Sequence, residues 1–257
     1  MDSAGLAFDV IIPTYHSRDL IDICIRSFEK FCMHGDERYP RIKIHYIIVE
    51  NSSDISYRDH VLSLAPGAIT WVNNPTHHKN SEGNAIGLEV GLKNALHDVV
   101  FFAHCDTCVT SNKFFETLFR LKSQGVRVIG TGLDNSRIKA LHQSGMFVDI
   151  NIARAVNLFP VYENGLMVLD VGDSITDYCR KNEVTHASMQ NTFNDNALID
   201  KLSSQYKGFN VDRTVLDDEV IFMHLGRGIP KTSGTYEKLG KPGLNEWKMF
   251  CERVLAQ

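Results

Sequence analysis

The stretch VVFFAHCDTCV, residues 99–109, decides the fold of this chain. Its first five residues are all apolar and begin with two valines, which is typical of a strand buried on both faces of a sheet. His104, Cys105 and Asp106 follow the strand directly. Ligands of parallel sheets bind beyond the carboxyl ends of the strands. The sequence therefore predicts a functional site just after residue 103.

Strand and helix patterns alternate on the amino-terminal side of this strand. They predict strands and helices in turn, with the strands at 8–14, 42–51 and 69–72 and the helices at 19–31 and 84–97. This order predicts an α/β fold with a mostly parallel central sheet flanked by helices. Glu50, at the end of the second strand, should then share one edge of the sheet with Asp106.

The carboxyl-terminal half has weaker patterns. It predicts a helix at 112–124, strands at 126–132 and 219–225, a short helix with Asp173 as its N-cap, and a terminal helix from about Leu244. Trp247, Phe250, Cys251 and Val254 follow the i, i+3, i+4, i+7 spacing of a buried helix face. Residues 134–170 have no clear period, so their elements stay undefined.

Composition and charge narrow the class of protein. The chain has 257 residues, of which 43% are hydrophobic, enough for the core of one large domain. A net charge of −4 gives no overall basic surface for nucleic acid. The first residues lack a signal-peptide pattern and no apolar run has the ~18 residues of a membrane span, so we expect a cytoplasmic protein. The six scattered cysteines predict free thiols.

Four segments in order carry a resemblance to a known family: VIIPTYHSRD at 10–19, IIVENSSD at 47–54, SEGNAIGLEVGLKNA at 81–95 and VVFFAHCDTCV at 99–109. Together they resemble the inverting GT-A glycosyltransferases of family two. The resemblance implies a single Rossmann-like GT-A domain over residues 1–257. A donor half would occupy 1–110, an acceptor half 111–228, and a lid with a helix 229–257.

The resemblance also implies a divalent metal site. The family's Asp-x-Asp motif appears here as His104-Cys105-Asp106, so only the second carboxylate is kept. His224, in DDEVIFMHLGRG at 217–228, matches the late histidine that can complete such a site. Mg²⁺ prefers oxygen ligands, whereas Mn²⁺ accepts imidazole readily. Asp106, His104 and His224 are the expected ligands, with Mn²⁺ or Mg²⁺ as the ion that neutralises a diphosphate leaving group.

Donor and acceptor residues follow from the same resemblance. The reaction implied is transfer of a sugar from a nucleotide-diphosphate sugar to a hydroxyl, with inversion. The residues expected at the donor are Pro13, Thr14, Tyr15, Glu50, Asn51, Gly83 and Arg227. Inversion needs a carboxylate base. LDVGDSITDYCRKN at 169–182 resembles the family's acidic motif, which gives Asp173 as the base and Asp170 as the alternative.

Several alternatives stay open. Cys105 and Cys108 have the spacing of a redox or zinc motif, but no second pair accompanies them. The altered metal motif allows a noncatalytic module that binds nucleotide sugars or glycans. The basic segment 227–253 allows a glycosyltransferase that acts on modified DNA bases. Glycans, lipid-linked saccharides, small molecules and nucleic acids all remain open as acceptors, and the sequence leaves the donor and the oligomeric state undefined.

Overall fold

The computed structural model describes residues 5–32, 42–78, 80–133, 138–193, 195–226 and 242–257. Its centre is a ten-stranded sheet in the order β3-β2-β1-β4-β7-β6-β10-β11-β12-β5. The first four strands in this order are mutually parallel: β3 (Ile69–Asn73), β2 (Lys43–Glu50), β1 (Ala7–Thr14) and β4 (Val99–Phe102). They confirm the α/β fold and the strands expected in the amino-terminal half.

The second half of the sheet is mixed. β7 (Leu141–Asp149) runs antiparallel to both β4 and β6 (Val128–Leu133), and β10 (His186–Asn191) is parallel to β6. Antiparallel pairs then join β10, β11 (Asp212–Leu216), β12 (Glu219–His224) and β5 (Thr107–Val109). A separate hairpin pairs β8 (Val161–Glu163) with β9 (Leu166–Leu169).

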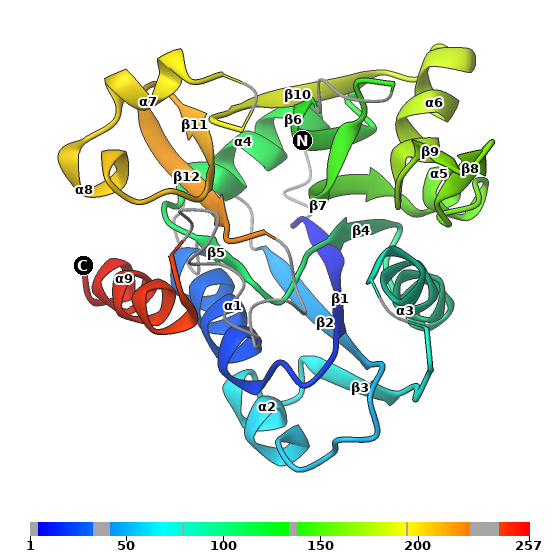
Figure 1. Ribbon diagram of the computed structural model, residues 1–257, viewed down its shortest axis with the longest axis horizontal. Helices are drawn as coiled ribbons and strands as arrows, with labels where there is room; N and C mark the ends of the chain where they lie inside the picture. The colour runs from blue at the N-terminus through cyan, green and yellow to red at the C-terminus, as the bar shows by residue number, and fades with distance from the viewer. Residues whose placement is uncertain (1–4, 33–41, 79, 134–137, 194, 227–241) are drawn as a thin grey trace.

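Helices cover both faces of the sheet. In Figure 1, α1 and α3 lie on opposite sides of β1 and β2. The helices are α1 (Arg18–Phe31), α2 (Arg58–Leu64), α3 (Asn80–Asn94), α4 (Lys113–Ser123), α5 (Ile150–Arg154), α6 (Asp173–Lys181), α7 (Ala197–Lys201), α8 (Ser204–Lys207) and α9 (Leu244–Ala256). None of the described helices combines the length and apolar character of a membrane-spanning segment.

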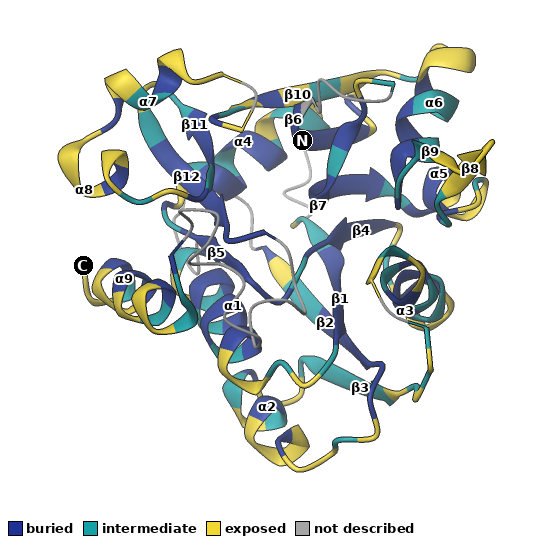
Figure 2. Cartoon of the chain, in the orientation of Figure 1, coloured by how far each residue is buried: buried dark blue, intermediate teal, exposed yellow. Residues whose placement is uncertain are grey.

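Alternate residues along the strands belong to two separate hydrophobic clusters, one on each face of the sheet. In β1, Val10 and Ile12 join the larger cluster with α1, whereas Ile11 joins the cluster beneath α3. Successive strand residues point to opposite faces of the sheet. Since each face of β1 packs against one of the two clusters, the strand is buried along most of its length (Figure 2). The larger cluster also takes the predicted apolar face of α9, where Trp247, Phe250, Cys251 and Val254 are buried.

Two details differ from the sequence expectation. The helix at 84–97 begins at Asn80 and ends at Asn94, because the backbone N–H groups of Leu96 and His97 donate to the Asp9 carboxylate on β1. Asp173 is not an N-cap: Gly172, with φ of 77°, takes that position and Asp173 is the first residue of α6. Gly172 adopts a left-handed conformation that glycine tolerates without strain. Arg227 and the expected lid up to residue 241 lie outside the described residues.

Candidate functional site

The carboxyl ends of β1 and β2 meet at one edge of the sheet. Thr14 and Glu50 are register partners, and the Thr14 hydroxyl donates to Glu50 Oε2 at 2.8 Å. Glu50 is fully buried and also accepts the Ser52 N–H, at 2.7 Å, and the Tyr57 hydroxyl. Burial, with the Glu50 contact, raises the pKa of the Tyr57 phenol, so it stays a donor. The Glu50 carboxylate therefore holds the loops that follow β1 and β2.

The first turn of α3 connects this edge to the segment after β4. Asn51 Nδ2 donates to the Gly83 carbonyl at 2.9 Å, and the neighbouring Asn84 Nδ2 lies 3.1 Å from His104 Nε2. The polar ends of β2 and β4 thus lie at one edge of the sheet, as strand order predicted, and α3 connects them. Among the expected donor residues, Pro13 is buried and Tyr15 is half-buried on the same loop.

Three predicted metal ligands come together beyond β4 and β12. His104 Nδ1 is 3.1 Å from His224 Nε2, and Asp106 Oδ1 is 3.5 Å from His224 Nε2 and 4.0 Å from His104 Nδ1. Asp106 and His224 are buried, whereas the His104 side chain is 28% exposed. β12 reaches this place because it pairs antiparallel with β5, which starts one residue after Asp106.

This donor set fits a divalent ion. The two imidazole nitrogens and the carboxylate oxygen all lie within 4.8 Å of one another. Octahedral ions with metal–ligand distances of ~2.1 Å place adjacent ligands about 3 Å apart, close to the separations found here. One carboxylate and two imidazoles suit Mn²⁺ better than Mg²⁺. His104, Asp106 and His224 would hold such an ion.

The side-chain amide of Asn84 lies against the outer nitrogen of His104, Nε2. Asn84 Nδ2 lies 3.1 Å from both His104 Nε2 and Gln143 Oε1. A metal at His104 Nδ1 requires the ring hydrogen on Nε2, and the partner must then accept. A half turn of both the Asn84 and Gln143 amides supplies Asn84 Oδ1 at that position and lets Gln143 Nε2 donate to it, since amide oxygen and nitrogen are interchangeable in shape. Asn84 is therefore placed to set the tautomer of His104.

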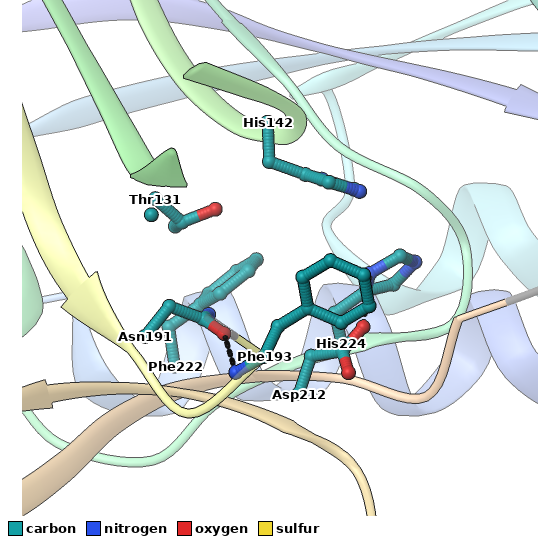
Figure 3. Close-up of a pocket in the computed structure, with 8 residues that line it drawn as sticks. Thr131, His142, Asn191, Phe193, Asp212, Phe222 and His224 are labelled. Atoms are coloured by element: carbon teal, nitrogen blue, oxygen red, sulfur yellow. Dashed lines mark hydrogen bonds and ion pairs between the residues drawn. The ribbon is translucent and has the colours of Figure 1, made fainter. Parts of the chain in front are cut away.

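A pocket opens beside His224. Its lining combines polar and aromatic side chains: Thr131, Gly132, His142, Asn191, Phe193, Asp212, Phe222 and His224. Figure 3 shows His142, Phe193, Asp212 and His224 around the pocket, and the His142 and His224 rings lie close together, with their centroids 5.1 Å apart. Asp212 Oδ2 is 3.7 Å from His224 Nδ1, the ring nitrogen turned away from Asp106. A small polar molecule in this pocket would adjoin the predicted metal site.

The two acidic residues predicted as base candidates lie together at the start of α6. The Asp170 N–H donates to Asp173 Oδ2 at 2.8 Å, and Asp173 is buried. Neither lines the pocket in Figure 3. The adjoining Gly172 packs closely on Gln143, where a Cβ would lie 3.1 Å from its side chain. Through Gln143 and Asn84, this end of α6 borders the surroundings of His104.

Sequence reasoning missed Asn84, His142, Phe193 and Asp212. His142 lies in the stretch without periodicity, and Asp212 comes from a strand that the sequence did not predict. Among the residues that line the pocket in the carboxyl-terminal half of the chain, only His224 was predicted, from the segment DDEVIFMHL.

The cysteine motif forms no part of the described site. Cys105 and Cys108 are buried free thiols, and the described residues place neither of them in a cluster of metal-ligating side chains. All six cysteines are free, as expected.

Comparison with known proteins agrees with this architecture. The model of glycosyl transferase family 2 matches residues 9–145, just over half of the sequence, and the chain belongs to this family. No curated protein matches it. The structure is similar to a mannosyltransferase from Pyrobaculum calidifontis in complex with GDP-Man and Mn²⁺, with a TM-score of 0.54 and 13% identity. That match covers 72% of this chain and 55% of the mannosyltransferase, and both share the GT-A fold.

A second solved structure, TarS from S. aureus, matches with a TM-score of 0.43 and 14% identity over 61% of this chain and 30% of TarS. The chain thus spans about half of the mannosyltransferase and less than a third of TarS.

Proposed function

We propose that the chain transfers a sugar from a nucleoside-diphosphate sugar to an acceptor hydroxyl, with inversion at the anomeric carbon and with Mn²⁺ or Mg²⁺ at His104, Asp106 and His224. One observation carries this proposal: the only carboxylate kept from the family motif lies within 4.0 Å of two imidazole nitrogens, at the carboxyl edge of the parallel strands. The mannosyltransferase with the similar fold was solved with GDP-Man and Mn²⁺, which supports the class of donor and favours manganese.

The chemistry explains why these residues belong together. Cleavage of the sugar–phosphate bond leaves negative charge on the nucleoside diphosphate, and a divalent ion supplies Lewis-acid stabilisation of that charge. Asp106 contributes the anionic ligand, and the two imidazoles add neutral nitrogen ligands. Asp212 Oδ2 lies 3.7 Å from His224 Nδ1, so a small movement would let it accept the ring hydrogen, as carboxylates commonly do for metal-binding histidines.

Donor and acceptor would enter from different parts of the fold. In this proposal residues 1–110 bind the nucleotide, and the residues at its edge are Pro13, Thr14, Tyr15, Asn51 and Gly83. Glu50 holds the loops that follow β1 and β2 in place beneath the nucleotide. Residues 111–228 contribute the pocket lined by His142, Phe193 and Asp212, which we assign to the sugar, and the start of α6, where we place the acceptor. Residues 229–257 would add the lid and helix.

The proposed base is Asp173, with Asp170 as the alternative. Inversion requires a carboxylate that removes the acceptor proton as the oxygen attacks the opposite face of the sugar. Asp173 begins α6, where the helix dipole favours a negative charge.

The test is metal-dependent nucleotide binding. UDP, GDP and dTDP are titrated into the protein by calorimetry, with Mn²⁺ and with a chelator. We expect at least one nucleotide to bind more tightly with Mn²⁺, and Asp106→Asn to abolish the difference, because the substitution removes the anionic ligand while keeping its shape. Asp200→Asn is the matched control, since this carboxylate is 84% exposed.

Three outcomes test the metal assignment and distinguish an enzyme from a noncatalytic module. Metal-dependent binding together with slow hydrolysis of the matching nucleotide sugar supports an enzyme. Equal nucleotide affinity with and without metal, in both the wild type and Asp106→Asn, contradicts the metal assignment. Binding without any hydrolysis or transfer favours a module that binds nucleotide sugars.

A further inference from the structure

A second cluster of metal-ligating side chains lies at the opposite edge of the sheet. Asp9 and His45 are register partners near the amino ends of β1 and β2, and His97 lies in the connection between α3 and β4. The five residue steps from Asp9 to Thr14 correspond to about 17 Å of extended strand. This cluster is therefore separate from the site around Asp106.

The Asp9 carboxylate is fixed in a fully buried position. Its Oδ2 accepts the backbone N–H groups of Leu96 and His97 at 2.9 and 2.8 Å. Burial by itself would raise the pKa of Asp9, but the hydrogen bonds from His45 and His97 outweigh burial and leave this pKa below its usual value. Asp9 is thus a preorganised anion inside the protein.

Both imidazoles point their Nδ1 atoms toward the other carboxylate oxygen of Asp9, Oδ1. His45 Nδ1 is 2.6 Å and His97 Nδ1 is 3.1 Å from Asp9 Oδ1. The three atoms all lie within 4.8 Å of one another. Tetrahedral zinc, with ligand distances of ~2.0–2.1 Å, separates its ligands by about 3.3 Å. Moving the His45 ring by about 0.7 Å would give its Nδ1 and Asp9 Oδ1 the separation that a tetrahedral zinc ion needs.

The surroundings of His45 suit a metal ligand. Its outer nitrogen, Nε2, lies 3.0 Å from the Thr70 hydroxyl on β3. A hydroxyl can donate or accept, so Thr70 satisfies Nε2 in either tautomer of the ring. When Nδ1 binds an ion, the hydrogen resides on Nε2 and donates to Thr70, which is the outer hydrogen bond that metal-binding histidines usually make.

We propose that Asp9, His45 and His97 form a binding site for a borderline divalent transition-metal ion such as Zn²⁺, with water as the fourth ligand. Two neutral imidazoles and one carboxylate prefer zinc, cobalt or nickel to magnesium or calcium. The side chains of His45 and His97 are 13% and 28% exposed, which gives an ion access from solvent. The site would tie β1, β2 and the segment before β4 together.

Outside the two clusters, two histidine–carboxylate pairs among the described residues lack a third ligand. His60 pairs with Asp22, and His78 with Glu82, both at 2.9 Å, yet neither pair belongs to a three-residue cluster in the described part of the chain. Their imidazoles are more than 40% exposed. These pairs serve as internal controls, because one imidazole and one exposed carboxylate bind zinc weakly.

The experiment measures zinc binding in the His104→Asn, His224→Asn background, which disables the cluster around Asp106. Zn²⁺ is titrated in competition with a chromophoric chelator. We expect one equivalent to bind, His45→Gln and His97→Gln each to weaken the affinity more than tenfold, His60→Gln to leave it unchanged, and Mg²⁺ not to compete. Asp9 is left intact because it also holds the backbone of residues 96 and 97.

Nitrogen NMR of the imidazole rings in the wild-type protein provides a second measurement that needs no disabled background. Zinc should shift the Nδ1 resonances of His45 and His97 in a fixed one-to-one ratio. Unshifted His45 and His97 resonances at saturating zinc, or zinc affinity equal in the His45→Gln, His97→Gln and parent proteins, would overturn the proposal and leave a purely hydrogen-bonded cluster.

Discussion

At the scale of single residues, the roles proposed for the carboxylates Asp173 and Asp212 can be separated by experiment. Asp173 is the base inferred from the family motif, whereas Asp212 adjoins the outer nitrogen of His224. A base acts on the transfer step itself, so its loss costs about 10²–10⁴ in rate at any metal concentration. An orienting residue acts on the metal, so its loss weakens metal affinity by about 10–100-fold and is offset by more metal.

We therefore expect Asp173→Asn to lose transfer activity that added Mn²⁺ does not restore, with nucleotide affinity nearly unchanged. Asp212→Asn should instead raise the Mn²⁺ concentration needed for half-maximal activity and recover at saturation. Steady-state rates over a Mn²⁺ titration measure both. An active Asp173→Asn protein would move the assignment to Asp170, and an Asp212→Asn protein that stays inactive at saturating metal would make Asp212 the base.

The sequence predicted the centre of the candidate site but not its surroundings. His104 and Asp106 follow a buried strand, and strand order alone places them at the ligand-binding edge. Asn84, His142 and Asp212 reach the same place through helix packing and antiparallel pairing in the second half. Those contacts join residues far apart in the chain, and local periodicity carries no information about them.

At the scale of elements, α3 lies close to β1 because glycines form its inner face. A Cβ on Gly91 would lie 2.2 Å from Ile11 Cγ2, and one on Gly87 would lie 2.7 Å from Pro13 Cβ. Ile11 is β-branched and fully buried, so its side chain has little freedom to move away. The close approach also positions Asn84, one turn earlier, against His104.

Gly91→Ala should consequently destabilise the protein although alanine is the better helix former. Overpacking of a filled core costs about 1–3 kcal/mol, whereas the gain in helix propensity is about 1 kcal/mol. Denaturant unfolding of Gly91→Ala should show a net loss of up to about 2 kcal/mol. Gly208→Ala is the control, because no atom lies within 4 Å of a Cβ there. Equal stability of the two variants would contradict close packing of α3 on β1.

Element prediction succeeded where the periodicity is local and failed where tertiary contacts decide. β1 and β2 were predicted to within a residue or two, because continuous apolar runs mark buried strands. The end of α3 was placed three residues too late. The N–H groups of Leu96 and His97, just after the helix, donate to the Asp9 carboxylate, and nothing in the local sequence indicates this contact. β7 was missed because polar residues at positions 142–144, in its first half, lie beside the site and interrupt the apolar strand pattern.

At the scale of the whole molecule, α9 brings the carboxyl-terminal segment back onto the amino-terminal half. Arg26 on α1 donates to Glu252 on α9, and Lys248 is 2.9 Å from Asp19. These pairs are exposed and contribute little. The buried contact of α9 contributes more to stability than these ion pairs. Trp247 is fully buried and stacks on Phe209, with ring centroids 6.3 Å apart. α9 is therefore part of the main core.

We expect Trp247→Ala to lower the free energy of unfolding by about 3–5 kcal/mol, because it deletes a large side chain from a filled core. Met249→Ala, two residues away and 69% exposed in the wild type, should change it by less than about 0.5 kcal/mol. Urea unfolding followed by circular dichroism and by tyrosine fluorescence measures both variants. If α9 shares one cooperative core with the sheet, both probes give the same lowered midpoint in Trp247→Ala. A separate early transition with an unchanged main midpoint would instead mean that α9 detaches alone, and Trp247 would then stabilise only its own helix.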